Sequence, residues 1–158
     1  MKKIILLFLW VSLGYAQQQI VTSSVTPSTF EETDQITITI NGSSINEATW
    51  GVFDNSLYMW AWAFDLNDIT PKGTPLNGTW ESSNEASKFT YNAGSDTYTK
   101  TITPTTYYNT TGIGRIGFLI KAKNGTGDKN SQDILVEVGT FQVTLTSPTQ
   151  NSATIITS

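Results

Sequence analysis

The segment 57–64, Leu-Tyr-Met-Trp-Ala-Trp-Ala-Phe, constrains the fold more than any other part of the chain. In a β-strand successive side chains point to opposite faces, so one face of this segment is aliphatic and the other is entirely aromatic. The aromatic face holds Tyr58, Trp60, Trp62 and Phe64. Such a face is either buried under a second layer or left partly open as a flat apolar platform. We expect at least one of its tryptophans to be exposed for binding.

The first 16 residues predict a secretory signal peptide. Lys2 and Lys3 precede a short apolar run, and the small residues Gly14 and Ala16 predict cleavage after Ala16. The run is too short to cross a bilayer, and no later segment is a better transmembrane candidate. The sequence has no cysteine, which excludes disulfides, a thiol nucleophile and the acylated cysteine of a bacterial lipoprotein. We therefore expect an exported protein, secreted or at the cell surface, that is not a lipoprotein.

The charge of the chain argues against two classes of partner. The sequence has 9 basic and 13 acidic residues, and removal of the leader with its two lysines leaves a formal charge of −6. An acidic chain without a basic cluster is a poor ligand for nucleic acid or for an anionic membrane. The sequence also has no histidine, so the commonest general base and metal ligand is missing.

Strand-like segments recur along the chain and are separated by turns rich in Asn, Gly, Ser and Asp. The clearest is 36–40, Ile-Thr-Ile-Thr-Ile, whose isoleucines are expected to face inward and whose threonines outward. The other expected strands are 17–27 at a sheet edge, 57–64, the hairpin of 88–91 with 97–103, the hairpin of 115–123 with 131–138, and 141–145. This pattern predicts an all-β fold, an immunoglobulin-like β-sandwich of about seven to eight antiparallel strands.

The expected sandwich module spans residues 17–145. The polar stretch that begins at 146 predicts a linker, and the chain to 158 looks like the start of a following, truncated module. Within the sandwich, the long connection 65–87 holds Trp80 and is expected to fold as a binding-side loop with a helical turn at 83–86. The connection 105–114 carries the adjacent Tyr107 and Tyr108 and is expected to be a loop.

No catalytic residues are assigned from the sequence. The carboxylates are scattered in turns, and no pair is placed across a cleft as glycoside hydrolysis requires. The sequence has no Gly-x-Ser-x-Gly elbow, no Walker loop and no histidine-based metal motif. Whether the whole protein is an enzyme stays open at this point.

Two clusters of oxygen-bearing side chains make calcium possible as a cofactor. Neither cluster has the spacing of an EF-hand loop, and Asp and Asn are also frequent in turns for conformational reasons. One cluster is Asp65, Asn67 and Asp68, and the other is Asp128, Asn130 and Asp133.

A glycan site accounts best for the surplus of aromatic residues. Sugar rings stack on flat aromatic side chains, while polar neighbours bind the hydroxyl groups. The alternatives are core packing for the aromatic residues and a solvated strand face for the lysines. The candidate glycan-binding residues are Trp60, Trp62, Trp80, Asn84, Lys121 and Lys123, with Asn77, Glu85, Tyr107 and Tyr108 as further candidates.

Three segments together resemble a known family: LYMWAW at 57–62, NGTWESSNEA at 77–86 and IGFLIKAKNGTGDKNSQD at 116–133. They are similar to the N-terminal β-sandwich module of secreted bacterial α-amylase-family glycoside hydrolases, which is related to the outer-membrane glycan-binding proteins of starch-utilisation systems. The resemblance implies a non-catalytic module that binds α-glucan or packs beside a C-terminal catalytic domain. It places no catalytic residue in this chain.

The sequence therefore predicts an extracellular carbohydrate-binding module for a polysaccharide, a starch-like α-glucan. Two other functions remain open. One is a structural spacer in which all tryptophans are buried, and the other is an adhesion domain that recognises protein through an edge strand.

Overall fold

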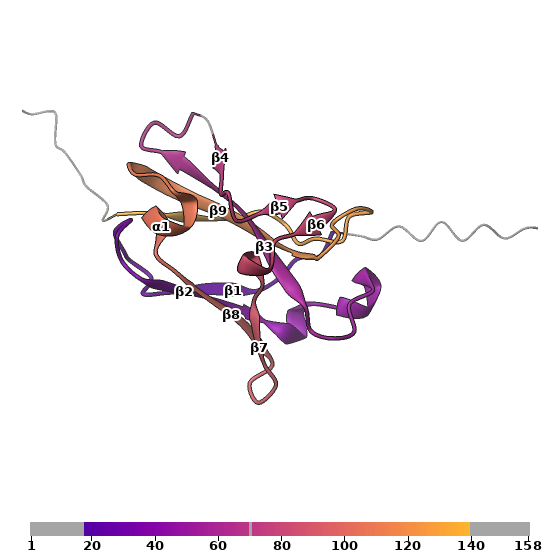
Figure 1. The fold of residues 1–158 in the computed structure, drawn as a ribbon. Helices are drawn as coiled ribbons and strands as arrows, with labels where there is room; N and C mark the ends of the chain where they lie inside the picture. The colour runs from indigo at the N-terminus through magenta and orange to yellow at the C-terminus, as the bar shows by residue number, and fades with distance from the viewer. Residues whose placement is uncertain (1–17, 70, 140–158) are drawn as a thin grey trace, which may run out of the picture.

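The computed structural model describes residues 18–69 and 71–139. The predicted signal peptide, the strand expected at 141–145 and the linker with the following module lie outside these residues. Within them, two four-stranded antiparallel sheets lie one above the other, and a two-stranded hairpin adjoins one of them (Figure 1). No helix in this part of the chain is long and apolar enough to cross a membrane.

The first sheet has the strand order β1-β2-β8-β7. Its strands confirm the predicted edge strand, the alternating strand and the first hairpin. They are β1 (Ser23–Thr26), β2 (Ile36–Asn41), β7 (Thr90–Asn92) and β8 (Thr97–Ile102). The isoleucines of β2 are buried with Tyr98 and Ile102 of β8, as the alternation predicts.

The second sheet has the strand order β10-β9-β3-β4. Its central strands pair over their full length, with Met59 opposite Ile120 and Ala61 opposite Phe118. The four strands are β3 (Leu57–Asp65), β4 (Lys72–Gly73), β9 (Ile113–Ala122) and β10 (Ile134–Glu137). The pair β9–β10 confirms the second predicted hairpin.

The sheet orders identify the sandwich as immunoglobulin-like. The eight strands of the two sheets can be lettered in chain order. The first sheet, β1-β2-β8-β7, then reads A-B-E-D, and the second, β10-β9-β3-β4, reads G-F-C-C′. This is the arrangement of immunoglobulin-type sandwiches. The eight strands of the two main sheets, counted over the described residues, agree with the predicted number.

Short elements close the sandwich at its ends. Two 3-10 turns, η1 (Gly42–Ser44) and η2 (Glu47–Trp50), follow β2 and bury Trp50. The hairpin of β5 (Gly78–Thr79) and β6 (Ser82–Ser83) is followed by η3 (Glu85–Ser87), close to the helical turn expected at 83–86. The connection expected as a loop from 105 holds the one helix of the described chain, α1 (Pro104–Tyr108).

The core lies between the two sheets and is filled mainly by aliphatic side chains. From β3 it receives Leu57, Met59, Ala61 and Ala63, which are at most 3% exposed. The aromatic side chains of β3 therefore lie on the opposite face of the sheet, away from the core. The structure thus resolves the alternative that the sequence left open for this strand: the sandwich core uses its aliphatic face.

Candidate functional site

The outer aromatic face of the second sheet is the stripe of Tyr58, Trp60, Trp62 and Phe64 along β3. Trp60, Trp62 and Phe64 are half-buried, whereas Tyr58 is 2% exposed. The stripe is therefore neither fully covered nor fully open, and the two predicted tryptophans of β3 share a face that reaches solvent.

A glycine on the neighbouring strand lets Trp62 lie flat on the sheet. Trp62 is paired with Gly117 of β9. A Cβ atom at Gly117 would lie 2.2 Å from Trp62 Nε1 and 2.3 Å from Trp62 Cε2, so any other residue would displace the indole. At the far end of the stripe, the guanidinium of Arg115 lies 4.6 Å from the ring centre of Phe64.

Trp80 joins the stripe from the β5–β6 hairpin. Its ring centre lies 5.1 Å from that of Trp60, with an angle of 82° between the ring planes, which is the edge-to-face arrangement that aromatic pairs prefer. The backbone N–H of Ser83 donates to the oxygen of Lys123 at 3.0 Å, and that of Gly125 donates to the oxygen of Trp80 at 2.9 Å. We call Trp60, Trp62 and Trp80 the tryptophan platform.

Asn77 attaches the start of this hairpin to β3. The backbone N–H of Ala61 donates to Asn77 Oδ1 at 2.9 Å, and Asn77 Nδ2 donates to the oxygen of Ala61 at 2.8 Å. One side chain thus provides both hydrogen bonds that a neighbouring strand would supply. Asn77 is 5% exposed, so it is a structural residue rather than the ligand contact that its amide suggested.

Lys121 is placed differently from its sequence prediction. Its side chain has no exposed surface, and its ammonium donates to Ser83 Oγ at 2.6 Å, to the oxygen of Ala122 at 3.0 Å and to the oxygen of Lys123 at 2.9 Å. All three protons of the ammonium therefore have acceptors within the chain. Lys121 joins β9 to the hairpin and offers no donor to a ligand.

The same ammonium lies beneath the platform. It is 5.1 Å from the ring centre of Trp80 and 5.9 Å from that of Trp60, within the range of cation–π attraction. Burial lowers the pKa of Lys121 to about 8, and the charge of Glu81 opposes this shift. The lysine therefore positions the two tryptophans relative to each other.

Lys123 and Asn84 remain at the surface near the platform, but both have local partners. Lys123 Nζ lies 2.5 Å from Glu85 Oε1, which also accepts the hydroxyl of Tyr58 at 3.0 Å. These two contacts, that of Lys123 first, lower the pKa of Glu85. Asn84 Oδ1 accepts the backbone N–H of Ala86 at 2.9 Å and so caps η3.

Tyr107 and Tyr108 do not belong to the platform. They lie in α1, are 6% and 0% exposed, and pack edge to face with ring centres 5.4 Å apart. Burial raises the pKa of both hydroxyl groups. The expectation that these adjacent tyrosines contribute binding surface is wrong, because a proline-initiated helical turn directs both of them into the core.

The calcium hypothesis receives no support from the described residues. No three His, Cys, Asp or Glu side chains gather at a common point in this part of the chain. In the first cluster Asp65 Oδ1 accepts the backbone N–H of Asn67, and Asp68 forms an ion pair with Arg115. In the second, Asn130 is buried and donates to the oxygen of Ser131.

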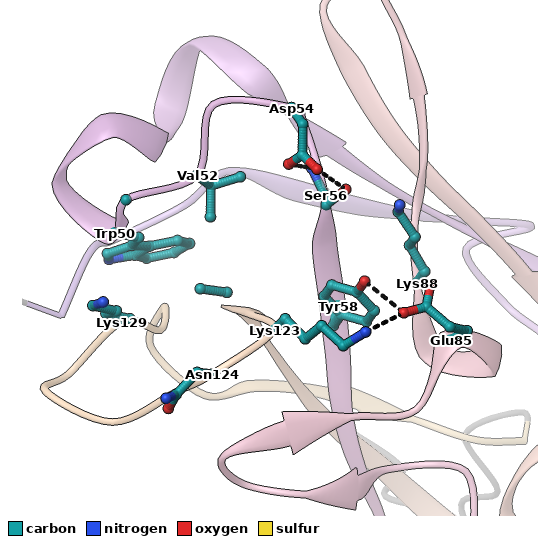
Figure 2. Close-up of a pocket in the computed structure, with 12 residues that line it drawn as sticks. Trp50, Val52, Asp54, Ser56, Tyr58, Glu85, Lys88, Lys123, Asn124 and Lys129 are labelled. Carbon is teal, nitrogen blue, oxygen red and sulfur yellow. Dashed lines mark hydrogen bonds and ion pairs between the residues drawn. The ribbon is translucent and has the colours of Figure 1, made fainter.

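A hollow of about 410 Å³ opens beside the first residue of the aromatic stripe, and Figure 2 shows its walls. We call it the lysine hollow, because three of its lining residues are Lys88, Lys123 and Lys129. The sequence does not reveal this hollow, since its walls come from distant segments and no local motif marks them. The other lining residues are Trp50, Gly51, Val52, Asp54, Ser56, Tyr58, Glu85, Ala122 and Asn124.

Comparison of the chain with protein-family models and with curated proteins finds no match.

Proposed function

We propose that this chain is an extracellular, non-catalytic carbohydrate-binding module that stacks a polysaccharide on its tryptophan platform. The observation that supports this proposal most strongly is the position of Trp60, Trp62 and Trp80, which lie outside a core already filled by other side chains and reach solvent. Partly exposed apolar groups that cluster on a soluble domain mark interaction sites.

The polymer that we propose as ligand is an α-glucan of the starch type. The resemblance of the segments 57–62, 77–86 and 116–133 to the N-terminal modules of α-amylase-family enzymes supports this choice. In this proposal the apolar run of the leader exports the protein, and a C-terminal catalytic domain acts on the bound polymer.

Binding at one such site is expected to be weak. Stacking on half-buried rings and a few exposed hydrogen bonds must compensate for the lost freedom of the ligand. A module of this kind gains effective affinity when several sites engage the same polymer. Polymer retention is therefore a better assay than binding of a short oligosaccharide.

Affinity gel electrophoresis tests the proposal. The purified chain is run in native gels that contain soluble starch, pullulan or a β-glucan, together with its Trp60→Ala, Trp62→Ala and Trp80→Ala variants. We expect starch and pullulan to retard the wild type and at least one of the folded tryptophan variants to migrate freely.

Phe53→Ala is the matched control, because Phe53 is an aromatic residue that is 84% exposed and is not part of the platform. A cooperative thermal unfolding transition verifies that each variant is folded. Retardation of all three tryptophan variants equal to that of the wild type would exclude the platform as the site. The absence of retardation in every glycan would instead favour a structural spacer, or an adhesion domain if the chain captures protein.

A further inference from the structure

Two separate segments, the one after η3 and the connection between β9 and β10, bring three lysines to the lysine hollow. Lys88 follows η3, Lys123 follows β9, and Lys129 lies in the connection between β9 and β10. The mature chain carries an excess of acidic residues, yet three of the seven basic side chains in the described residues line this one hollow. Opposite charge does not fully compensate them, because the hollow has only two carboxylates, those of Asp54 and Glu85.

The lysines of the hollow differ from the other basic residues in their contacts. Within the described chain, five basic side chains donate to a protein acceptor, namely Lys72, Lys100, Arg115, Lys121 and Lys123. The ammonium groups of Lys88 and Lys129 form no hydrogen bond or ion pair within residues 18–69 and 71–139. The ammonium of Lys88 lies 5.9 Å from the ring centre of Tyr58, and its charge helps to lower the pKa of Asp54 and of Glu85 without an ion pair to either.

The carboxylates of the hollow are already engaged. Asp54 accepts the backbone N–H of Ser56 at 3.1 Å and its hydroxyl at 2.9 Å. These contacts, led by that of the hydroxyl, lower the pKa of Asp54. Glu85 accepts Tyr58 and Lys123, as described above. The groups of the hollow that still lack a hydrogen-bond partner are therefore mostly donors. A ligand that fills the hollow must bring acceptors.

We propose that the lysine hollow binds a single anionic group, a carboxylate or a sulfate ester, carried by a sugar residue, with Lys88 and Lys129 as its donors. Charge-assisted hydrogen bonds of this kind are stronger than neutral ones. Trp50 and Tyr58 also line the hollow, but they are 1% and 2% exposed, so a ligand there contacts mainly the polar side chains around them. A polyanion is a poorer candidate, because the rest of the domain is acidic and repels it.

The hollow adjoins the aromatic stripe at Tyr58. Tyr58 belongs to the aromatic stripe and also lines the hollow, with the ammonium of Lys123 5.8 Å from its ring centre. An anionic sugar in the hollow therefore lies at the Tyr58 end of the aromatic stripe, next to Trp60. This site goes beyond the proposed function, which requires only stacking of a neutral polymer.

Two-dimensional NMR of the ¹⁵N-labelled chain tests this site. The probes are sodium glucuronate, glucose 6-sulfate, glucose and inorganic sulfate, each titrated at low ionic strength, where screening is weakest. We expect glucuronate or glucose 6-sulfate to shift the amides of Lys88 and of residues 123–129, and glucose to leave them unchanged. The tighter of the two charged sugars identifies the anionic group.

We expect Lys88→Gln and Lys129→Gln each to weaken the binding of the charged sugar. In the double variant the dissociation constant is expected to rise by about five-fold or more, as for exposed ion pairs that act together. Lys72→Gln is the matched control, because it removes the same charge from β4, outside the hollow. Unchanged thermal unfolding shows that the variants fold.

Four outcomes would overturn the proposal: no shift with either charged sugar, equal shifts with glucose, equal affinity for inorganic sulfate, or unchanged affinity in the double variant. None of these depends on starch retention. Failure of the anionic site is thus distinguishable from failure of the tryptophan platform.

Discussion

The outer faces of the two sheets differ although their inner faces are alike. The inner faces of both sheets are mainly apolar and buried, with Lys100 as a half-buried exception on the first sheet. The outer face of sheet β1-β2-β8-β7 carries short polar side chains, whereas that of sheet β10-β9-β3-β4 carries the aromatic stripe. The outward residues of the first sheet are Ser24, Thr26, Thr37, Thr39, Thr90, Asn92, Thr97, Thr99 and Thr101.

This difference shows that the tryptophans of β3 are not needed to fill the core. A sandwich of this size can expose an outer face of threonines to water. Threonines suit strands and pair across them, as Thr37 and Thr101 do through a 2.9 Å hydrogen bond between their hydroxyls. The second sheet instead supports its aromatic side chains with two glycines, Gly117 and Gly125, and a buried lysine. Such support is consistent with a surface kept for binding.

The largest expected effect comes from removing the space under Trp62. Gly117→Ala places a methyl group where the indole lies, so the ring must leave the sheet surface. Overpacking of this kind costs about 1–3 kcal/mol of unfolding free energy. Urea unfolding measures the loss, and native gels with starch measure the weakened platform.

Gly94→Ala is the control for this change. Gly94 lies in the turn between β7 and β8, and its nearest neighbour would be Asn92 Oδ1 at 3.3 Å. An effect within about 0.5 kcal/mol is expected there. If both alanine variants unfold at the same urea concentration and bind starch equally, the proposed contact between Gly117 and Trp62 does not support the platform.

An intermediate effect is expected from the charge buried beneath the platform. The pKa of Lys121 is about 8 in the folded chain, against 10.5 for a free lysine, so above pH 8 the unfolded chain holds the proton more tightly than the folded one. Stability therefore rises between pH 8 and pH 10 from this group. Above pH 10 it falls, because the pKa of Tyr58 is raised to about 12 and the unfolded chain releases that proton first.

Lys121→Met is expected to flatten the rise between pH 8 and pH 10 without removing the decline above pH 10. Thermal unfolding over this pH range compares the two proteins. Lys100→Met is a useful second variant, because burial also lowers the pKa of Lys100, which lies on the other sheet. Parallel stability curves for wild type and Lys121→Met would contradict the burial of a charged Lys121.

The smallest effect is expected on the threonine face. Thr37→Val keeps the β-branched shape and removes a hydrogen bond that is open to water. The unfolding free energy of this variant is expected to change by less than about 0.5 kcal/mol. Its retention in starch gels is expected to equal that of the wild type. A loss of starch retention would locate the binding surface on both sheets and remove the contrast between them.

The alternation of side chains predicted most of the fold because it is a local property of strands. Ile36, Ile38 and Ile40 are buried as their period requires, and Tyr98 and Ile102 follow the same rule. For β3 the period predicted two faces but not which one is inward. That choice depends on β9, whose buried Ile116 and Phe118 meet the aliphatic face, and a local pattern does not contain it.

The candidate site was predictable only in part. Trp60 and Trp80 were expected to act together, and the structure brings their rings into contact. Lys121 falls on the outward face of β9, as alternation requires, yet it is buried because the connection that contains Ser83 folds back over it. The lysine hollow was not predictable for the same reason, since its walls meet only in the folded sandwich.

The β5–β6 hairpin has a consequence for how a ligand is bound. Short two-stranded units open locally at lower free energy than the sheet that carries them. We expect local opening of this hairpin to separate Trp80 from Trp60 while the sandwich stays folded. Under the proposed function, a sugar that contacts both rings would select the closed hairpin, and its apparent affinity would be the intrinsic affinity multiplied by the closed fraction. Under the same proposal, the hydrogen bonds of Asn77 and Lys121 to this region would set the ligand affinity without any contact to the ligand.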